Sequence, residues 1–107
     1  MESRSIEFLT RRLGREIRNP TFLRLPRIAG SSVAATMLAD SAGNGNSVII
    51  DGRHSVLHSE SFAFQLMADL RNSGPKEIIV LGGTEEWQTD IVKAAEEYSL
   101  EITRVTL

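Results

Sequence analysis

Two runs of β-branched and aliphatic residues lie between segments of helical periodicity, and this alternation limits the fold more than any other feature. The runs occupy residues 47–51 and 77–82. Continuous apolar runs of this length are typical of strands buried on both faces of a parallel sheet. Extended segments at residues 22–28 and 101–106 predict two more strands, the first interrupted by Pro26, which indicates an edge strand or a bulge. The sequence therefore predicts an α/β fold with a mainly parallel sheet of four to five strands.

Four segments with helical spacing accompany these strands. The first is amphipathic and ends before Pro20, because the residue before a proline disfavours helical geometry. Serine or threonine caps are expected at the start of the other three, at Ser31 or Ser32, at Ser59 and at Thr84. We divide the chain into an N-terminal amphipathic helix, residues 1–20, and an α/β domain, residues 21–107.

The apolar positions of each helix predict which face is buried. The stripe of the first helix consists of Ile6, Leu9, Leu13 and Ile17. For the second helix we expect Val33, Ala34, Met37 and Leu38 to point inward. For the third and fourth helices we expect Phe62, Leu66, Met67 and Leu70, and Trp87, Ile91, Ala95 and Tyr98. Ile49 and Ile79 are expected to share one interior with Phe62, Leu66, Met67 and Ile91.

Composition excludes several classes of protein. A chain of 107 residues, of which 41% are hydrophobic, fits one globular domain. The absence of cysteine excludes disulfides, cysteine zinc sites and a thiol nucleophile. No apolar run approaches the roughly 20 residues of a membrane span, and charge rather than an apolar leader follows Met1. We expect a cytoplasmic protein.

Charge is distributed unevenly along the chain. Residues 1–27 contain seven arginines and three glutamates, whereas the remainder is acidic. A basic segment of this kind can contact nucleic acid or another anion. The candidate contacts lie mostly off the apolar stripe and are Arg4, Arg11, Arg12, Arg15 and Arg18. Because the segment is of mixed sign, we favour a solvated or intramolecularly docked face and keep nucleic-acid binding as the alternative.

Residues 51–60 contain most of the side chains capable of chemistry. Asp51, His54, His58 and Glu60 are ligands that zinc accepts, but their spacing matches no compact metal motif. Ser59 and Ser61 lack the G-x-S-x-G surroundings of a nucleophile elbow. We therefore expect no metal, no cofactor and no catalytic residue, and we predict that the protein is not an enzyme. A metal-assisted hydrolase using His54 and His58 is the alternative enzyme class.

A strand-to-helix turn at residues 82–84, Gly-Gly-Thr, superficially resembles a phosphate-binding loop. Such loops use the positive end of a helix dipole to hold the anion. Here Glu85 and Glu86 follow the turn and would repel phosphate, and no recognised nucleotide motif is present. We interpret the turn as structural.

The segment from the strand at residues 48–51 to the helix beginning near Ser59 resembles STAS domains, the domains of sulphate transporters and anti-sigma factor antagonists. In that family an apolar strand ends in aspartate, and a short serine-containing motif about eight residues later opens a helix. Here Val-Ile-Ile-Asp at residues 48–51 matches the strand, and Ser-Glu-Ser-Phe-Ala at residues 59–63 stands at the motif. The resemblance covers residues 22–107 and implies a STAS-like fold.

The resemblance implies function through protein binding. In anti-sigma factor antagonists a kinase phosphorylates a serine or threonine at this helix start, which breaks the partner complex. By position that residue is Glu60, so the chain is either fixed in a phosphorylated-like state or regulated at Ser59 or Ser61. The implied partner is a sigma-factor regulator or its kinase. The implied surface comprises Asp51, His58, Ser59, Glu60, Ser61 and Phe62.

Two further expectations concern assembly and nucleic-acid association. The apolar stripe of the first helix must be covered by this chain or by a second copy, so a homodimer through this helix is predicted. The stretch from Val80 to Ile102 also resembles the end of small accessory domains of mobile-element proteins. That resemblance implies a nucleic-acid-associated role for the arginine-rich helix.

Overall fold

The strands and helices alternate as the sequence predicts, in a computed structural model that describes residues 2–43 and 46–106. Within these residues the helices are α1 (Glu2–Leu13), α2 (Ser32–Asp40), α3 (Glu60–Ser73) and α4 (Glu85–Glu97). The strands are β1 (Pro20–Arg24), β2 (Ile28–Ala29), β3 (Ser47–Asp51), β4 (Leu57–His58), β5 (Glu77–Leu81) and β6 (Ile102–Val105).

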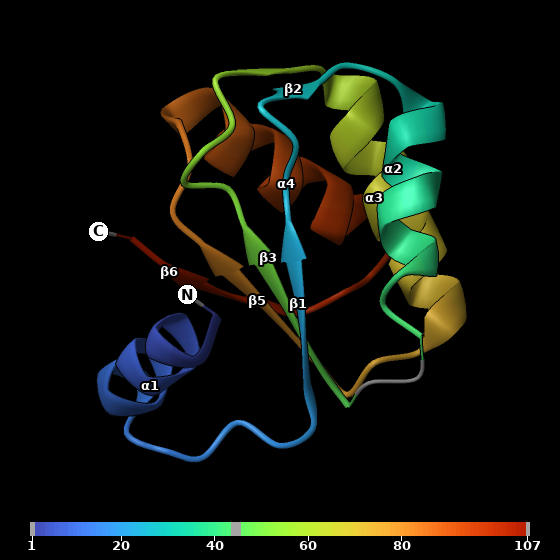
Figure 1. Ribbon diagram of the computed structural model, residues 1–107. Helices are drawn as coiled ribbons and strands as arrows, with labels where there is room; N and C mark the ends of the chain where they lie inside the picture. The colour runs from blue at the N-terminus through green and yellow to red at the C-terminus, as the bar shows by residue number, and fades with distance from the viewer. Residues whose placement is uncertain (1, 44–45, 107) are drawn as a thin grey trace.

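The main sheet has four parallel strands in the order β1-β3-β5-β6. Spatial order thus follows chain order, and α2, α3 and α4, which lie in the connections between successive strands, cover one face (Figure 1). α1 lies on the opposite face (Figure 1). The expected four-stranded, mainly parallel α/β architecture is confirmed. A separate two-stranded parallel sheet formed by β2 and β4 was not expected from the sequence.

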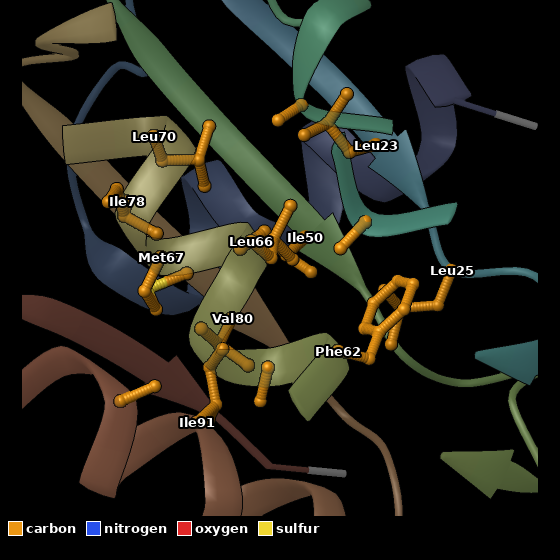
Figure 2. Close-up of a cluster of buried hydrophobic side chains, with 14 of the residues drawn as sticks. Leu23, Leu25, Ile50, Phe62, Leu66, Met67, Leu70, Ile78, Val80 and Ile91 are labelled. Carbon is orange, nitrogen blue, oxygen red and sulfur yellow. The ribbon is translucent and has the colours of Figure 1, made fainter. Parts of the chain in front are cut away.

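The three-helix face contains the larger of two apolar clusters. Alternate strand residues, Val48 and Ile50 on β3 and Ile78 and Val80 on β5, point toward the helices. Figure 2 shows Leu66, Met67 and Leu70 of α3 meeting them, with Ile91 of α4 nearby. Leu66 is 0% exposed, so this cluster is a dry, close-packed layer.

The second face is covered by α1 alone. Leu9 and Ile17 pack there with the other set of strand residues, Ile49, Ile79, Leu81 and Val105. All six residues expected in the core are buried, but the expectation that they share one interior is wrong. Ile49 and Ile79 face α1 because successive residues of a strand point to opposite sides of the sheet.

The expected caps are formed at three helix starts. The side chains of Ser31, Ser59 and Thr84 accept hydrogen bonds from the backbone N–H groups of Ala34, Phe62 and Trp87. α3 ends at Gly74, whose φ of 69° lies in the left-handed region that glycine adopts without strain. Local sequence chemistry therefore sets these boundaries.

α2 turns a different face inward from the one expected. Ala35 and Ala39 are buried, whereas Val33 and Met37 are each 69% exposed. The buried alanines leave room for α2 to approach the core closely, and the larger side chains remain outside. The inward assignment of Val33 and Met37 is therefore wrong.

α1 is packed on the sheet, although the sequence division set residues 1–20 apart from residues 21–107. Leu9 is 0% exposed and Ile17 is 6% exposed. The stripe expected to make a homodimer is thus largely covered by this chain's own sheet, which removes the reason for that prediction. No helix in the described part of the chain is long and apolar enough to cross a membrane.

Candidate functional site

The carboxyl ends of the parallel strands and the start of each following helix gather at one end of the molecule. The β2 and β4 segments lie over the same end (Figure 1). Open α/β sheets place their functional groups at this edge, because the loops there are free to vary. The expected site residues from 51 to 62 all belong to this region.

The N-terminal end of α3 is held by serine hydroxyls. Ser59 Oγ accepts from the Phe62 N–H at 3.2 Å and donates to the Gly30 carbonyl at 3.1 Å. Ser61 Oγ lies 3.0 Å from Ser59 Oγ. Ser59 is therefore engaged in positioning the helix, whereas Ser61, an exposed residue, has that one hydroxyl contact.

Glu60 extends from the first turn of α3 into solvent, with its side chain 62% exposed. Negative charge is favoured there by the helix dipole. Its Oε2 lies 4.0 Å from Lys93 Nζ, an exposed ion pair that contributes little. Glu60 thus carries a charge at the surface that its local contacts scarcely constrain.

The β2–β4 pair leads directly into this helix start. Ile28 pairs with Leu57, and Ala29 pairs with His58. The Ser59 N–H then donates to the Ala29 carbonyl at 3.0 Å. Backbone pairing thus fixes the exposed side chains of Ile28 and Leu57 beside the start of α3.

Five large apolar side chains are exposed on adjoining elements of this end. Ile28 is 62% exposed, Leu57 is 61% exposed and Val56 is 53% exposed, and Val33 and Met37 lie on the outer face of α2. We call these five residues the β2–β4 surface. A hollow of about 380 Å³ adjoins it, lined by Val56, Leu57, His58, Thr84, Glu85 and Glu86. Large apolar side chains exposed on neighbouring segments are candidates for an interaction site.

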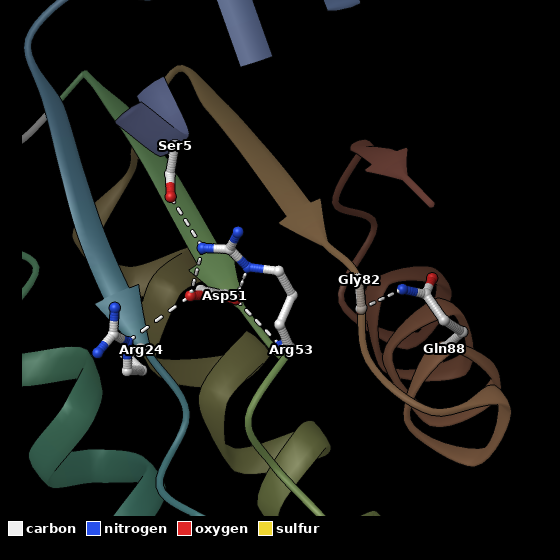
Figure 3. A network of polar contacts seen from close by, with 6 residues as sticks. All are labelled: Ser5, Arg24, Asp51, Arg53, Gly82 and Gln88. Atoms are coloured by element: carbon white, nitrogen blue, oxygen red, sulfur yellow. Dashed lines mark hydrogen bonds and ion pairs between the residues drawn. The ribbon is translucent and has the colours of Figure 1, made fainter. Parts of the chain in front are cut away.

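Asp51, which is buried, lies at the centre of an ionic network with two partly exposed arginines (Figure 3). Its carboxylate accepts from Arg53 Nε at 2.9 Å and from Arg53 Nη2 at 3.0 Å, and Arg24 Nε is 3.7 Å away. Arg53 Nη2 also donates to Ser5 Oγ of α1 at 2.8 Å. The network therefore joins β1, β3 and α1.

Arg53 favours the ionised form of Asp51. Burial opposes the charged form, but the hydrogen bonds from Arg53 outweigh it, so the pKa of Asp51 lies below its ordinary value. Asp51 is 0% exposed. The expectation that it contacts a partner directly is wrong, because the carboxylate is enclosed and already bonded.

Phe62 and His58 are also tied to the interior. Phe62 is 0% exposed and packs edge-on against Trp87, with ring centroids 6.2 Å apart. The assignment of Phe62 to a partner surface is therefore wrong. His58 is half-buried, with Nε2 at 2.6 Å from Thr84 Oγ1. Of the expected partner-binding residues, Ser59, Glu60 and Ser61 thus lie at the surface. His58 lies at the edge of this exposed group.

The candidate anion-contacting arginines do not form one free face. Arg15 donates to both carboxylate oxygens of Glu77, at 3.2 and 2.5 Å, and Arg11 donates to Glu7 at 2.8 Å. The hydrogen bond from Arg15 lowers the pKa of Glu77 and raises that of Arg15 itself. The remaining three, Arg4, Arg12 and Arg18, are exposed.

Metal-ligating side chains do not converge in the described residues. No group of three or more histidine, aspartate or glutamate side chains there is placed to hold a metal ion. His54 is exposed, and its electrostatic interaction with Asp51 helps to lower the pKa of that carboxyl group. The hydrolase alternative therefore gains no geometric support.

Sequence reasoning missed the β2–β4 surface. Two-residue strands are too short to show any periodicity, and the exposed face of α2 was assigned to the core. A signal was present in the alanines at 35 and 39, which recur at helical spacing. Comparisons with models of known protein families, with curated proteins and with solved structures find no significant match for this chain.

Proposed function

We propose that this chain is a non-enzymatic protein-binding domain whose partner docks on the β2–β4 surface beside the N-terminal end of α3. The observation that carries the proposal is the exposure of five large apolar side chains on adjoining elements, each more than half accessible to solvent. Exposed apolar area is stabilised when a partner removes it from water. A binding role accounts for the arrangement.

The charges around this surface define the chemistry of the partner. Glu85 and Glu86 line the adjoining hollow together with Val56 and Leu57, and Glu60 stands at the start of α3. Acidic groups bordering an apolar centre favour a partner that presents apolar side chains flanked by lysine or arginine. The proposed occupant is therefore a basic, amphipathic protein segment.

The resemblance to anti-sigma factor antagonists extends this proposal. On that basis the partner is a sigma-factor regulator or its kinase, in a STAS-like domain, and regulation acts at the start of α3. The exposure of Ser61 and Glu60 supports a regulatory role there, because a charge added or removed at these positions would lie next to the apolar contact area. Ser59 is the less suitable position, since its hydroxyl already serves as the cap.

Substitution within the surface tests the proposal. Wild type, Leu57→Asp and Met37→Asp are compared as baits in quantitative affinity capture from native lysate, with each captured protein then retested in purified form. Phe8→Asp serves as the matched control, because Phe8 is an exposed apolar residue on α1, at 38% exposure. We expect a direct partner retained by wild type and Phe8→Asp and lost by both surface variants. A partner set that is identical for all four proteins would contradict the proposal.

A second comparison tests regulation once the partner is purified. Wild type, Glu60→Gln and Glu60→Ser are titrated against it. If the charge of Glu60 acts in the complex, both variants should change the affinity by more than their small effect on stability explains. Equal affinities for the three proteins would restrict Glu60 to a helix-start charge.

A further inference from the structure

A second hollow lies at the carboxyl ends of β3, β5 and β6, on the other side of Thr84 from the β2–β4 surface. Its volume is about 420 Å³. Three glycines line it, Gly52 after β3 and Gly82 and Gly83 after β5. The remaining lining residues carry hydrogen-bonding side chains and are Arg53, Ser55, Thr84 and Thr106.

The glycines are required by the tryptophan beneath them. A Cβ atom at Gly83 would lie 2.5 Å from Trp87 Cδ1, and one at Gly52 would lie 3.1 Å from Trp87 Nε1. The Cδ1–Nε1 side of the indole ring therefore lies against Gly52 and Gly83, two of the glycines that line the hollow. Side chains at these positions would fill the cradle and separate the indole from it.

The indole N–H has no acceptor. Trp87 is 0% exposed, and its Nε1 is one of three buried side-chain atoms without a hydrogen-bond partner in the described residues. The other two, His58 Nδ1 and Gln88 Oε1, belong to the same end of the sheet. A buried polar group without a partner is costly, so such groups gather where a ligand or an ordered water completes them.

The charge of the hollow favours an anion. Asp51 is faced by two arginines, Arg53 and Arg24, so this cluster carries one net positive charge. Arg53 uses Nε and Nη2 for Asp51 and Ser5, which leaves Nη1 outside these bonds.

Glu85 and Glu86, the acidic residues that would repel phosphate, line other hollows. Glu85 and Glu86 line the 380 Å³ hollow beside the β2–β4 surface, and Glu85 also lines a third hollow, between α4 and β6. Neither lines the glycine-lined hollow. Arg53 is thus its charged lining residue, while Glu85 and Glu86 follow Thr84 in the first turn of α4 and face other hollows.

We propose that the glycine-lined hollow binds a small oxyanion, a phosphate group or a carboxylate. Arg53 supplies the positive charge, the hydroxyl of Thr106 supplies a neutral donor, and the Trp87 N–H is the donor beneath the glycines, whereas the Ser55 hydroxyl already donates to the Leu57 carbonyl. The start of α4 is capped by Thr84 and carries Glu85 and Glu86 in its first turn, so the positive charge of the site comes from Arg53 and not from the helix dipole. This site is separate from the proposed protein-binding surface and does not depend on it.

The indole N–H provides a direct readout, because the chain contains one tryptophan. The uniformly ¹⁵N-labelled full chain is titrated at constant ionic strength with inorganic phosphate, O-phosphoserine or acetate, with chloride as the salt control. The indole cross-peak is followed by ¹H–¹⁵N NMR. We expect a saturable shift with at least one oxyanion and none with chloride. Phosphate or phosphoserine alone would identify a phosphate site, and acetate alone would identify a carboxylate site.

Charge variants test where the anion binds. Thr106→Glu places a negative charge at the hollow, and Asn72→Glu adds the same charge at an exposed position near the end of α3. We expect Thr106→Glu to weaken binding about tenfold and Asn72→Glu to leave it unchanged. Thr106→Val, which only removes the hydroxyl, should weaken binding by a smaller factor and replaces Thr106→Glu if that variant does not fold.

Three results would overturn the proposal. The first is the absence of a saturable shift for all three oxyanions up to about 50 mM, which would exclude even weak binding. The second is a chloride titration that reproduces the shift. The third is equal affinity in wild type, Thr106→Glu and Thr106→Val.

Discussion

The two faces of the sheet are covered in different ways. On one face α2, α3 and α4 are built into the chain between successive strands, and they enclose the larger apolar cluster. On the other face the N-terminal helix α1 alone covers a smaller cluster. Two polar contacts help to hold α1 and the segment after it, one between Ser5 and Arg53 and one between Arg15 and Glu77.

This difference separates stability against global unfolding from stability against local opening of α1. The crossover helices cannot leave the sheet without disrupting the strands on either side of them, so their burial contributes to global unfolding. Within the described residues α1 lies outside the connections between strands, so it can separate in a local opening of lower free energy. We expect the three-helix face to govern overall stability and the α1 face to respond first to mild perturbation.

The largest effect is expected in the three-helix cluster. Leu66→Ala should lower the free energy of unfolding by about 2–5 kcal/mol, because Leu66 is fully buried among residues that cannot close the cavity. Leu9→Ala, at the equally buried position on α1, should cost less, about 2 kcal/mol, because α1 can shift to fill the space. Urea denaturation measures both values.

Hydrogen exchange sharpens the same comparison. In Leu9→Ala the amides of α1 should exchange faster while those of α3 keep their protection. In Leu66→Ala protection should fall throughout the sheet. Equal loss in the two variants, with α1 and α3 exchanging together, would show that the two faces open as one unit.

Lowering the pH is expected to have an intermediate effect on the free energy of unfolding. The pKa of Asp51 and that of Glu77 are lower in the folded protein than in the unfolded chain, whose carboxyl groups titrate near about pH 4. The unfolded state therefore binds protons first as pH falls. The stability that these carboxylates contribute is complete above about pH 5 and is lost as pH falls through the folded-state pKa.

Asp51→Asn tests the contribution of Asp51, the buried one of these two carboxylates, separately from that of Glu77. At neutral pH the variant should be less stable by about 1–3 kcal/mol, because the neutral amide gives weaker hydrogen bonds to Arg53. Its stability should also depend less on pH than that of wild type below about pH 5. Unfolding free energies at pH 7 and in mild acid give the comparison, and parallel pH profiles would remove Asp51 from the explanation.

The smallest effect is expected at the β2–β4 surface. Leu57→Asp should change the free energy of unfolding by less than about 0.5 kcal/mol, because Leu57 is 61% exposed and loses little packing. Thermal unfolding of wild type and variant checks this value. A loss above about 1.5 kcal/mol would mean that Leu57 is structural, and the surface would then lose its interpretation as a binding site.

The regular elements could be predicted because their signals are local. The apolar runs at residues 47–51 and 77–81 predicted strands, and hydroxyl caps such as Ser59 and Thr84 predicted where helices begin. The two faces of the central strands could not be told apart, since both Ile49 and its neighbour Ile50 are apolar and buried. Only the pairing with α1 or with α3 distinguishes them.

The site was less predictable because it depends on distant contacts. Asp51 at a strand end looks like an accessible acid, and its burial requires Arg24 from β1 and Ser5 from α1 as well as Arg53. The β2–β4 pair joins residues 28–29 to residues 57–58, a separation at which no local pattern acts. The start of α3 was located correctly because a capping serine is local chemistry.

The helix that covers the second face of the sheet is synthesised before the strands against which it packs. α1 emerges before every strand, yet the residues that cover it include Ile79 and Leu81 on β5 and Val105 on β6. During synthesis its apolar stripe therefore stays uncovered until β5 and β6 have been made. Until then the nascent chain exposes an apolar helix, and that helix is the segment for which a chaperone would compete.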